Sequence, residues 1–328
     1  MATVGLKVLR MLRALAFLGL SFCFLRAEAQ PAPSQRPAIT GIAFFRDYTT
    51  HPAEAQKFYG PTMGFAEKTS PDAPNVWIFP VNASQWIEVL HDEAPPTPNG
   101  RMAAVGFTTR DVRAMEHYLN GHGVPTAVPM KDSEFGVRDP EGNLVFFVQS
   151  PYNTSTGDHQ LAGIARQVST VQPLPSATSV RMIHVGFIVR DRDKENTFWR
   201  ELLGFKPYWY GAPTPSTPTT YVSLQVPDGT DWLEYMLRQP AEPDLHGSGV
   251  MDHFSLGTER MQTVLADLQR NGCMGKDCTS IQAGVDGKIQ LNLFDPDLTR
   301  IEYMEFKPAL QPCCSPFTGT QPGPVENQ

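Results

Sequence analysis

The chain repeats itself, and the repeat restricts the folds that it can adopt. An apolar segment that ends in Arg-Asp occurs at residues 41–47 and again at 183–191. A short helical stretch with an aromatic pair follows each copy, Phe58-Tyr59 in one and Phe198-Trp199 in the other, and Gly-Phe comes next. Matching segments in a fixed order indicate that one supersecondary unit has been duplicated.

A second level of repetition lies within each half. The segment 86–90 matches 232–236, and both have a central Glu. Each half then has an amphipathic helical pattern, at 112–119 and 261–268, and an Asp-Pro turn at Asp139 or Asp295 that leads into a last strand. The chain also has 30 Pro and 26 Gly, which favour short strands and turns over a helical bundle. We therefore expect four strand-helix-strands modules, two in each half.

The two halves are flanked by segments of different composition. Three basic residues precede the apolar run 14–25, and Ala27-Glu28-Ala29 follows it, a pattern typical of a secretory signal. The run is too short to span a bilayer, although an uncleaved membrane anchor is the alternative. The predicted organisation is a signal peptide (1–29), a first domain (38–150), a polar linker (151–179), a second domain (180–307) and a flexible tail (308–328). We expect an exported protein, periplasmic or secreted, with no membrane association after cleavage.

Export changes the interpretation of the cysteines. An oxidising compartment favours disulfides among the four in the last quarter of the chain, which are Cys273, Cys278, Cys313 and Cys314. Adjacent cysteines rarely bond to each other, so we expect bridges from Cys273 and Cys278 to the Cys313-Cys314 pair. Free thiols and a metal site are the alternatives. The formal net charge of −7 argues against nucleic acid as a partner.

The ordered recurrence of these modules resembles the vicinal oxygen chelate superfamily, which includes glyoxalases, bleomycin-resistance proteins and extradiol dioxygenases. The resemblance implies an α+β fold of four βαβββ modules that pair into two cup-shaped, curved mixed sheets in tandem. It also implies that a metal site takes its ligands from the first and last strands of each module.

In the second half those positions are His184, Glu234, His253 and Glu302. Strand alternation lets each point into the cup, where a bare charge is expensive without a cation partner. Two imidazoles and two carboxylates suit one divalent ion, Zn, Ni, Mn, Co or Fe. In the first half the same alignment gives Thr40, Glu88, Ala104 and Phe146, so we expect a metal-free, supporting cup. The other histidines considered there lie in expected loops or a helix: His51, His91, His117 and His122.

Three functions remain open from the sequence. We expect a metal-dependent enzyme with glyoxalase-like lyase or isomerase chemistry on a small substrate that chelates the metal through vicinal oxygens. In it Glu234 and Glu302 are the candidate catalytic groups, since a ligand Glu can leave the metal and act as a base. The alternative is an extradiol-type, non-haem iron ring-cleavage dioxygenase. It would use His184, His253 and Glu302 as ligands, with His246, Tyr303 or Tyr235 as acid-base candidates.

The third function is a non-catalytic, resistance-type protein that binds a small molecule. The intact ligand set argues against it. Aromatic residues near the ligand positions predict an apolar or aromatic wall for the substrate in all three cases: Trp232, Tyr235, Trp199 and Tyr208.

Overall fold

The computed structural model of the protein describes residues 35–71, 73–151, 161–275 and 278–324. The predicted signal peptide, residues 1–29, lies outside these ranges. Among the helices that the ranges contain, none has the length and hydropathy needed to cross a membrane.

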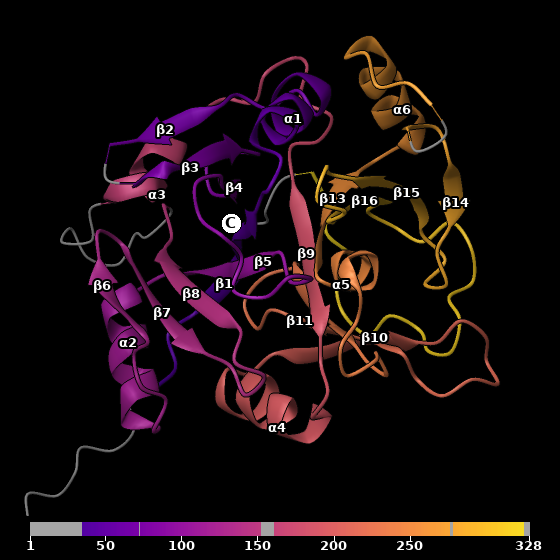
Figure 1. Cartoon of the computed structure of the whole chain (residues 1–328). Coiled ribbons are helices and arrows are strands. Elements are labelled where there is room, and N and C mark those ends of the chain that lie inside the picture. Colours follow the sequence, from indigo (N-terminus) through magenta and orange to yellow (C-terminus); the bar gives the residue numbers. More distant parts are fainter. Residues whose placement is uncertain (1–34, 72, 152–160, 276–277, 325–328) are drawn as a thin grey trace, which may run out of the picture. The chain divides into compact units, whose positions relative to one another are not determined.

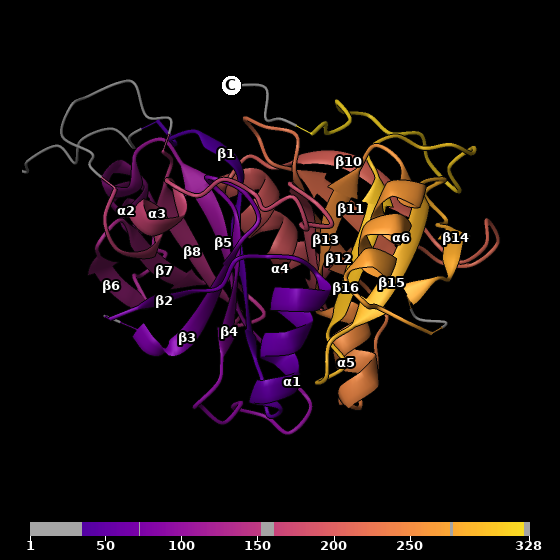
Figure 2. The same cartoon turned by 90° about the horizontal axis from the view of Figure 1, so that it is seen from above.

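Each half forms one mixed sheet of eight strands, and the two sheets have the same order (Figures 1 and 2). The spatial order in the first sheet is β2 (Lys68–Ser70), β3 (Ala73–Pro80), β4 (Trp86–Leu90), β1 (Ile39–Tyr48), β5 (Met102–Thr109), β8 (Leu144–Gln149), β7 (Glu134–Arg138) and β6 (Val128–Lys131). In the second it is β10 (Lys206–Gly211), β11 (Tyr221–Gln225), β12 (Trp232–Met236), β9 (Met182–Ile188), β13 (His253–Thr258), β16 (Arg300–Glu305), β15 (Ile289–Phe294) and β14 (Ile281–Ala283). The predicted fold class, two curved mixed sheets built from four modules, is confirmed.

The helices follow the repeat as well. Each module has its helix after its first strand: α1 (Pro52–Lys57) with η1 (Phe58–Thr62), α2 (Val112–Gly121), α4 (Arg192–Asn196) with η2 (Thr197–Leu202), and α6 (Met261–Arg270). Outside this pattern lie α3 (Gly163–Val168) and α5 (Leu245–Met251). Asp111 is the N-cap of helix α2, and its carboxylate accepts a hydrogen bond from the Ala114 amide. The helix buries Val112, Met115 and Leu119, as the periodicity predicts.

One hydrophobic core is shared by the two halves. The ring of Phe45 in β1 lies 5.1 Å from that of Phe254 in β13. Phe107 in β5 lies 5.3 Å from Trp199 and 5.4 Å from Phe205 of the second half. The opposite, concave face of each sheet, here called its cup, has a separate apolar cluster. The halves therefore fold against each other and each keeps its own cup.

An acidic residue in the last turn of the second half binds the first half. The buried carboxylate of Asp297 accepts hydrogen bonds from the Thr49 hydroxyl at 2.6 Å and from the Thr50 hydroxyl at 2.5 Å. Arg101 donates to it at 3.2 Å. Thr49 and Thr50 directly follow β1, so the turn between β15 and β16 fixes the end of the first strand of the other half.

The equivalent turn of the first half does the same in the other direction. The carboxylate of Glu141, in the turn between β7 and β8, accepts hydrogen bonds from the amides of Arg190 and Asp191, both at 2.7 Å. These two residues follow β9. The repeated Asp-Pro turns are thus paired by two reciprocal contacts, called below the Asp297 contact and the Glu141 contact.

The segment expected to be a linker contains a helix that covers the first cup. Ala165 and Val168 of α3 are buried in one cluster with Phe44, Trp86 and Phe146 from the strands. The Ala162 amide donates a hydrogen bond to Ser133 at 2.7 Å. Helix α3 is therefore an element of the first half.

The segment expected to be a flexible tail covers the second cup as far as residue 324. Phe317 packs against Tyr208, with ring centroids 4.9 Å apart, and Gln321 accepts a hydrogen bond from the Tyr208 hydroxyl at 2.7 Å. The Thr318 amide donates to the Tyr208 carbonyl at 2.9 Å. Apolar packing and backbone hydrogen bonds fix this segment, although its polar composition resembles that of a flexible chain.

The cysteines pair within each group. Cys273 is bonded to Cys278, and Cys313 is bonded to its neighbour Cys314. The predicted bridges between the two groups are wrong, because the turn after α6 brings Cys278 back to Cys273.

Candidate metal centre

The four predicted ligands of the second half meet in the second cup. His184 lies on β9, Glu234 on β12, His253 on β13 and Glu302 on β16. The Nε2 atoms of His184 and His253 are 3.0 Å apart. An oxygen of Glu302 lies 3.2 Å from Nε2 of His184, and an oxygen of Glu234 lies 3.8 Å from Nε2 of His253. One donor atom each from His184, Glu234 and His253 lies within 4.8 Å of the other two.

The two imidazoles have the protonation that a metal ligand needs. Burial lowers the pKa of both His184 and His253, and for His253 the charge of Arg300 adds to the effect. Nδ1 of His253 is 2.9 Å from the Met251 carbonyl, to which it donates, so the lone pair of the ring is on Nε2 and faces the cluster. Two nitrogens bound at right angles to one ion, each at about 2.1 Å, lie about 3.0 Å apart. The histidine pair fits this arrangement.

The two carboxylates also fit a cation. Burial and the charge of Glu302 raise the pKa of Glu234 to about 7, while Ser223 donates one hydrogen bond to it at 3.2 Å. Burial acts to raise the pKa of Glu302, but the charge of Arg300 and the hydrogen bond with His184 outweigh this effect and hold the pKa below its ordinary value. Two inward carboxylates are costly in a cup without a bound ion.

Arg300 is a component of the site that the sequence analysis missed. Its Nη2 donates to Nε2 of His253 at 2.8 Å, and its Nη1 lies 3.7 Å from a Glu302 oxygen. It stands two residues before Glu302 on β16, so strand alternation places both on one face. That spacing is the signal from which it could have been found. Arg300 occupies the lone pair of His253 that a metal would use.

A cavity of about 250 Å³ is lined by two of the four candidate ligands, Glu234 and Glu302. Glu234, Arg300 and Glu302 form part of its wall, and Trp209 and Tyr221 supply aromatic surface that the sequence analysis did not single out. Both belong to the hairpin of β10 and β11, next to the ligand strand β12. The cavity gives a small substrate access to these two carboxylates.

None of the four residues predicted to form the aromatic wall lines this cavity. Trp232 lies 4.8 Å from His184, and Tyr208 lies 5.2 Å from Trp232, both under the C-terminal segment. Tyr235 and Trp199 are instead buried in the core that the two halves share. Tyr235 follows Glu234 directly, so strand alternation turns it to the opposite face.

The acid-base candidates of the ring-cleavage hypothesis lie away from the ligands. The Tyr303 hydroxyl is buried 2.6 Å from the Thr178 hydroxyl on the core face of β16. His246 is exposed on α5, where it packs against Phe294 with ring centroids 5.6 Å apart. Neither lines the cavity beside the metal centre.

The strand register corrects one position in the first half. Trp86 and Glu88 of β4 pair with Phe44 and Arg46 of β1, as Trp232 and Glu234 of β12 pair with His184 and Gly186 of β9. Phe44, and not Thr40, is therefore the counterpart of His184. Glu88, Ala104 and Phe146 remain the counterparts of Glu234, His253 and Glu302. The first cup thus offers one carboxylate and no imidazole at these positions.

Comparison with known proteins agrees with this architecture. A family model described as the Glyoxalase/Bleomycin resistance protein/Dioxygenase superfamily matches residues 41–147 and 181–303. A search of curated proteins gives no match.

Solved structures with a similar fold include 2,3-dioxygenases. Homoprotocatechuate 2,3-dioxygenase from Arthrobacter globiformis is 16% identical, with a TM-score of 0.57 over 84% of this chain and 82% of that one. The 2,3-dioxygenase LapB from Pseudomonas sp. KL28 is 15% identical, with a TM-score of 0.58 over 86% of this chain and 97% of that one. At this level of identity the likeness shows a common fold. The matched family model, which spans both halves, shows that the chain belongs to the glyoxalase, bleomycin-resistance and dioxygenase superfamily.

Proposed function

We propose that the second cup binds one divalent metal ion and that the protein is a metal-dependent enzyme acting on a small molecule. The observation that supports this proposal is the convergence of four donor side chains from four strands: His184, Glu234, His253 and Glu302. When bound, such an ion is a Lewis acid for a substrate that offers two vicinal oxygens. The donor set suits Zn, Ni, Mn, Co or Fe.

The reaction class that we propose is redox-neutral lyase or isomerase chemistry. Glu234 supports it, because this second carboxylate stands at the cavity wall beside the space for substrate. Its hydrogen bond from Ser223 orients it, and its place beside the space for substrate suits a general base. Glu302 is held by His184 and Arg300 and keeps its charge at the centre.

Ring cleavage is the second candidate. The observation in its favour is the tandem fold shared with the 2,3-dioxygenases, in which His184, His253 and Glu302 would be the iron ligands. The positions of Tyr303, Tyr235 and His246 argue against it, because none of these three acid-base candidates lines the cavity beside the ligands.

Elemental analysis of the purified mature protein tests the metal site. We expect one ion per chain in the wild type and none in His184→Ala or His253→Ala. Loss of a residue that supports a ligand typically lowers metal affinity ~10–100-fold, and loss of a ligand itself should lower it further. Glu88→Gln in the first cup is the matched control for Glu234→Gln and should leave the metal content unchanged. Two ions per chain, or equal content in His253→Ala, would show that the ligand assignment is wrong.

Two assays on the loaded protein then separate the reactions. For proton transfer, the probe is dihydroxyacetone in D₂O, and deuterium at its carbon atoms is followed by NMR. For ring cleavage, the probe is 3,4-dihydroxyphenylacetate, and oxygen consumption is followed with an electrode. Oxygen uptake in proportion to catechol loss would replace our proposal by the second candidate.

We also propose that the protein is exported and that residues 1–29 are its signal peptide. The order of basic, apolar and small residues before Gln30 supports this proposal. N-terminal sequencing of exported material should begin at or near Gln30. Material that begins at Met1 or Ala2 would contradict it.

A further inference from the structure

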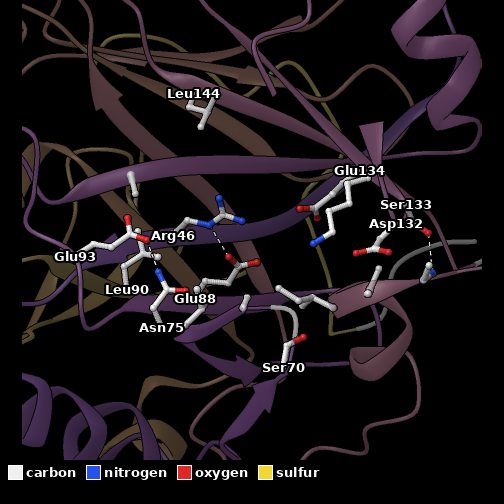
Figure 3. A pocket seen from close by; sticks show the side chains of 18 of the residues that line it. Arg46, Ser70, Asn75, Glu88, Leu90, Glu93, Asp132, Ser133, Glu134 and Leu144 are labelled. Carbon is white, nitrogen blue, oxygen red and sulfur yellow. Dashed lines mark hydrogen bonds and ion pairs between the residues drawn. The ribbon is translucent and has the colours of Figure 1, made fainter. Parts of the chain in front are cut away.

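A second cavity, of about 370 Å³, lies in the first cup (Figure 3). It belongs to the other half of the chain from the metal centre, and the start of α3 forms part of its wall. Its apolar lining includes Leu90, Leu144 and Ile164, and its charged lining comprises Arg46, Glu88, Glu93, Lys131, Asp132 and Glu134. Its volume is in the range of sites for small molecules.

An arginine occupies the place in this cup that corresponds to the metal. Nε of Arg46 donates to Glu88, the counterpart of Glu234, at 2.5 Å. Its guanidinium carbon lies 5.0 Å from the ring centroid of Phe44 and 4.8 Å from that of Phe146. These are the counterparts of His184 and Glu302, so a fixed cation stands among three of the four ligand positions. Within the described residues the Nη groups of Arg46 have no partner, and Figure 3 shows them turned away from Glu88.

A carboxylate without a partner faces this arginine. Glu134, the first residue of β7, points across the cavity toward Arg46 (Figure 3). No hydrogen bond or ion pair to its side chain occurs in the described part of the chain. Burial and the charge of Glu88 raise the pKa of Glu134 to about 7, although the positive charges of Arg46 and Lys131 oppose this rise. Glu88 is already saturated, since Trp86 donates to its other oxygen at 2.6 Å.

We propose that this cavity binds a small apolar α-amino acid. Its carboxylate would accept hydrogen bonds from the Nη groups of Arg46, its ammonium group would donate to Glu134, and its side chain would lie against Leu90 and Leu144. A plain anion would leave Glu134 unpaired and repelled, and a plain cation would face Arg46. A zwitterion satisfies both charges, whereas a peptide terminus offers only one of them.

Isothermal titration of the full-length mature protein with three probes of one shape tests this site. The probes are L-leucine, its methyl ester, which has only the ammonium charge, and 4-methylpentanoate, which has only the carboxylate. L-Leucine should bind with a Kd below about 1 mM, and each single-charge probe at least about tenfold more weakly. Absence of leucine binding, or equal affinity for the three probes, would overturn the proposal.

Two variants assign the roles of the charged residues. Glu134→Gln should weaken L-leucine at least about tenfold and leave 4-methylpentanoate unchanged or tighter, because it removes only the partner of the ammonium group. Glu54→Gln, on the exposed face of α1, removes the same charge in the same half and should change nothing. Leucine binding that is insensitive to Glu134→Gln would overturn the proposal. His253→Ala should bind leucine like the wild type, which separates this site from the metal centre.

Discussion

Gly186 and His253 face each other across β9 and β13, and a Cβ atom at residue 186 would lie 2.3 Å from Cε1 of the histidine ring. The imidazole therefore occupies the space of the missing side chain. In the first half the same cross-strand pair is Arg46 with Ala104. In the second half the small residue, Gly186, is on β9 and the large residue, His253, is on β13. In the first half the large residue, Arg46, is on β1 and the small residue, Ala104, is on β5. The space that the imidazole fills in the second half is therefore available to the arginine in the first half.

Gly186→Ala should therefore displace His253 and abolish tight metal binding. Because the contact is with a ring that packing holds in place, we expect a loss beyond ~100-fold in affinity. Metal affinity measured by competition with a coloured chelator checks this. Gly121→Ala on α2, where an added Cβ meets nothing within 4 Å, is the control and should bind like the wild type. Unchanged affinity in Gly186→Ala would contradict the role of this glycine.

Arg300→Gln should bind the metal more tightly than the wild type. The arginine donates to the lone pair of His253 and places a positive charge beside the ion, so its removal lifts two competing effects. A gain of about tenfold in affinity, near 1.4 kcal/mol, is expected in the same competition assay. Arg270→Gln removes an exposed charge on α6 and should have no effect. Weaker binding by Arg300→Gln would mean that the arginine supports the site.

Removal of the metal should lower the melting temperature. The ion binds the folded chain through two inward carboxylates that otherwise repel each other. At a free metal concentration 100 times the Kd, the stabilisation amounts to about 2.7 kcal/mol. Calorimetry with and without a chelator measures it, and His253→Ala serves as the insensitive control. Equal melting temperatures of the wild type in both conditions would exclude an ion bound to the native state.

Asp297→Asn should destabilise the protein by about 1.5–3 kcal/mol, the usual range for hydrogen bonds to a charged group. Burial acts to raise the pKa of Asp297, but donors from Thr49, Thr50 and Arg101 lower it overall. Since the folded pKa lies below the unfolded value, this stability is present above about pH 4 and is lost as the pH falls through the folded pKa. Urea unfolding at neutral pH and at pH 3 measures the difference between variant and wild type.

Glu141→Gln is the matched comparison for that experiment. This substitution weakens the Glu141 contact. The ion pair of Glu141 with the Arg190 side chain is exposed to solvent, since that side chain is 49% exposed, so the loss of stability should be smaller than for Asp297→Asn. An equal loss at both pH values for Asp297→Asn would rule out the charge as the source of the stability.

The repeat in the sequence predicted the modules, because equivalent segments recur in both halves, and the resemblance to the superfamily implied the four candidate ligand positions of the second half. The alignment of the two halves failed for Thr40, because the Arg-Asp pair at 46–47 lies inside β1 while the pair at 190–191 follows β9. Register irregularities in β1, between Ile42 and Phe44 among others, also disturb the alternation on which such an alignment depends.

Other features depend on contacts that no local pattern encodes. Polar, proline-rich composition suggested mobile segments after each half, but Ala165 and Phe317 each find an apolar cup to cover. The spacing to Glu302 puts Arg300 on the ligand face, but its contact with His253 follows only once β13 and β16 lie side by side. The cysteine pairs depend on the paths of the turns that contain them.

The reciprocity of the Asp297 and Glu141 contacts bears on the origin of the chain. In each half, the acid of the last turn accepts hydrogen bonds from residues that follow the first strand of the other half. A two-fold homodimer has the same self-complementary pattern. Fusion of two copies of a half-length ancestor would produce this arrangement. Once joined, the copies need not keep the same residues, so Phe44 and Arg46 of one half can stand where His184 and Gly186 stand in the other.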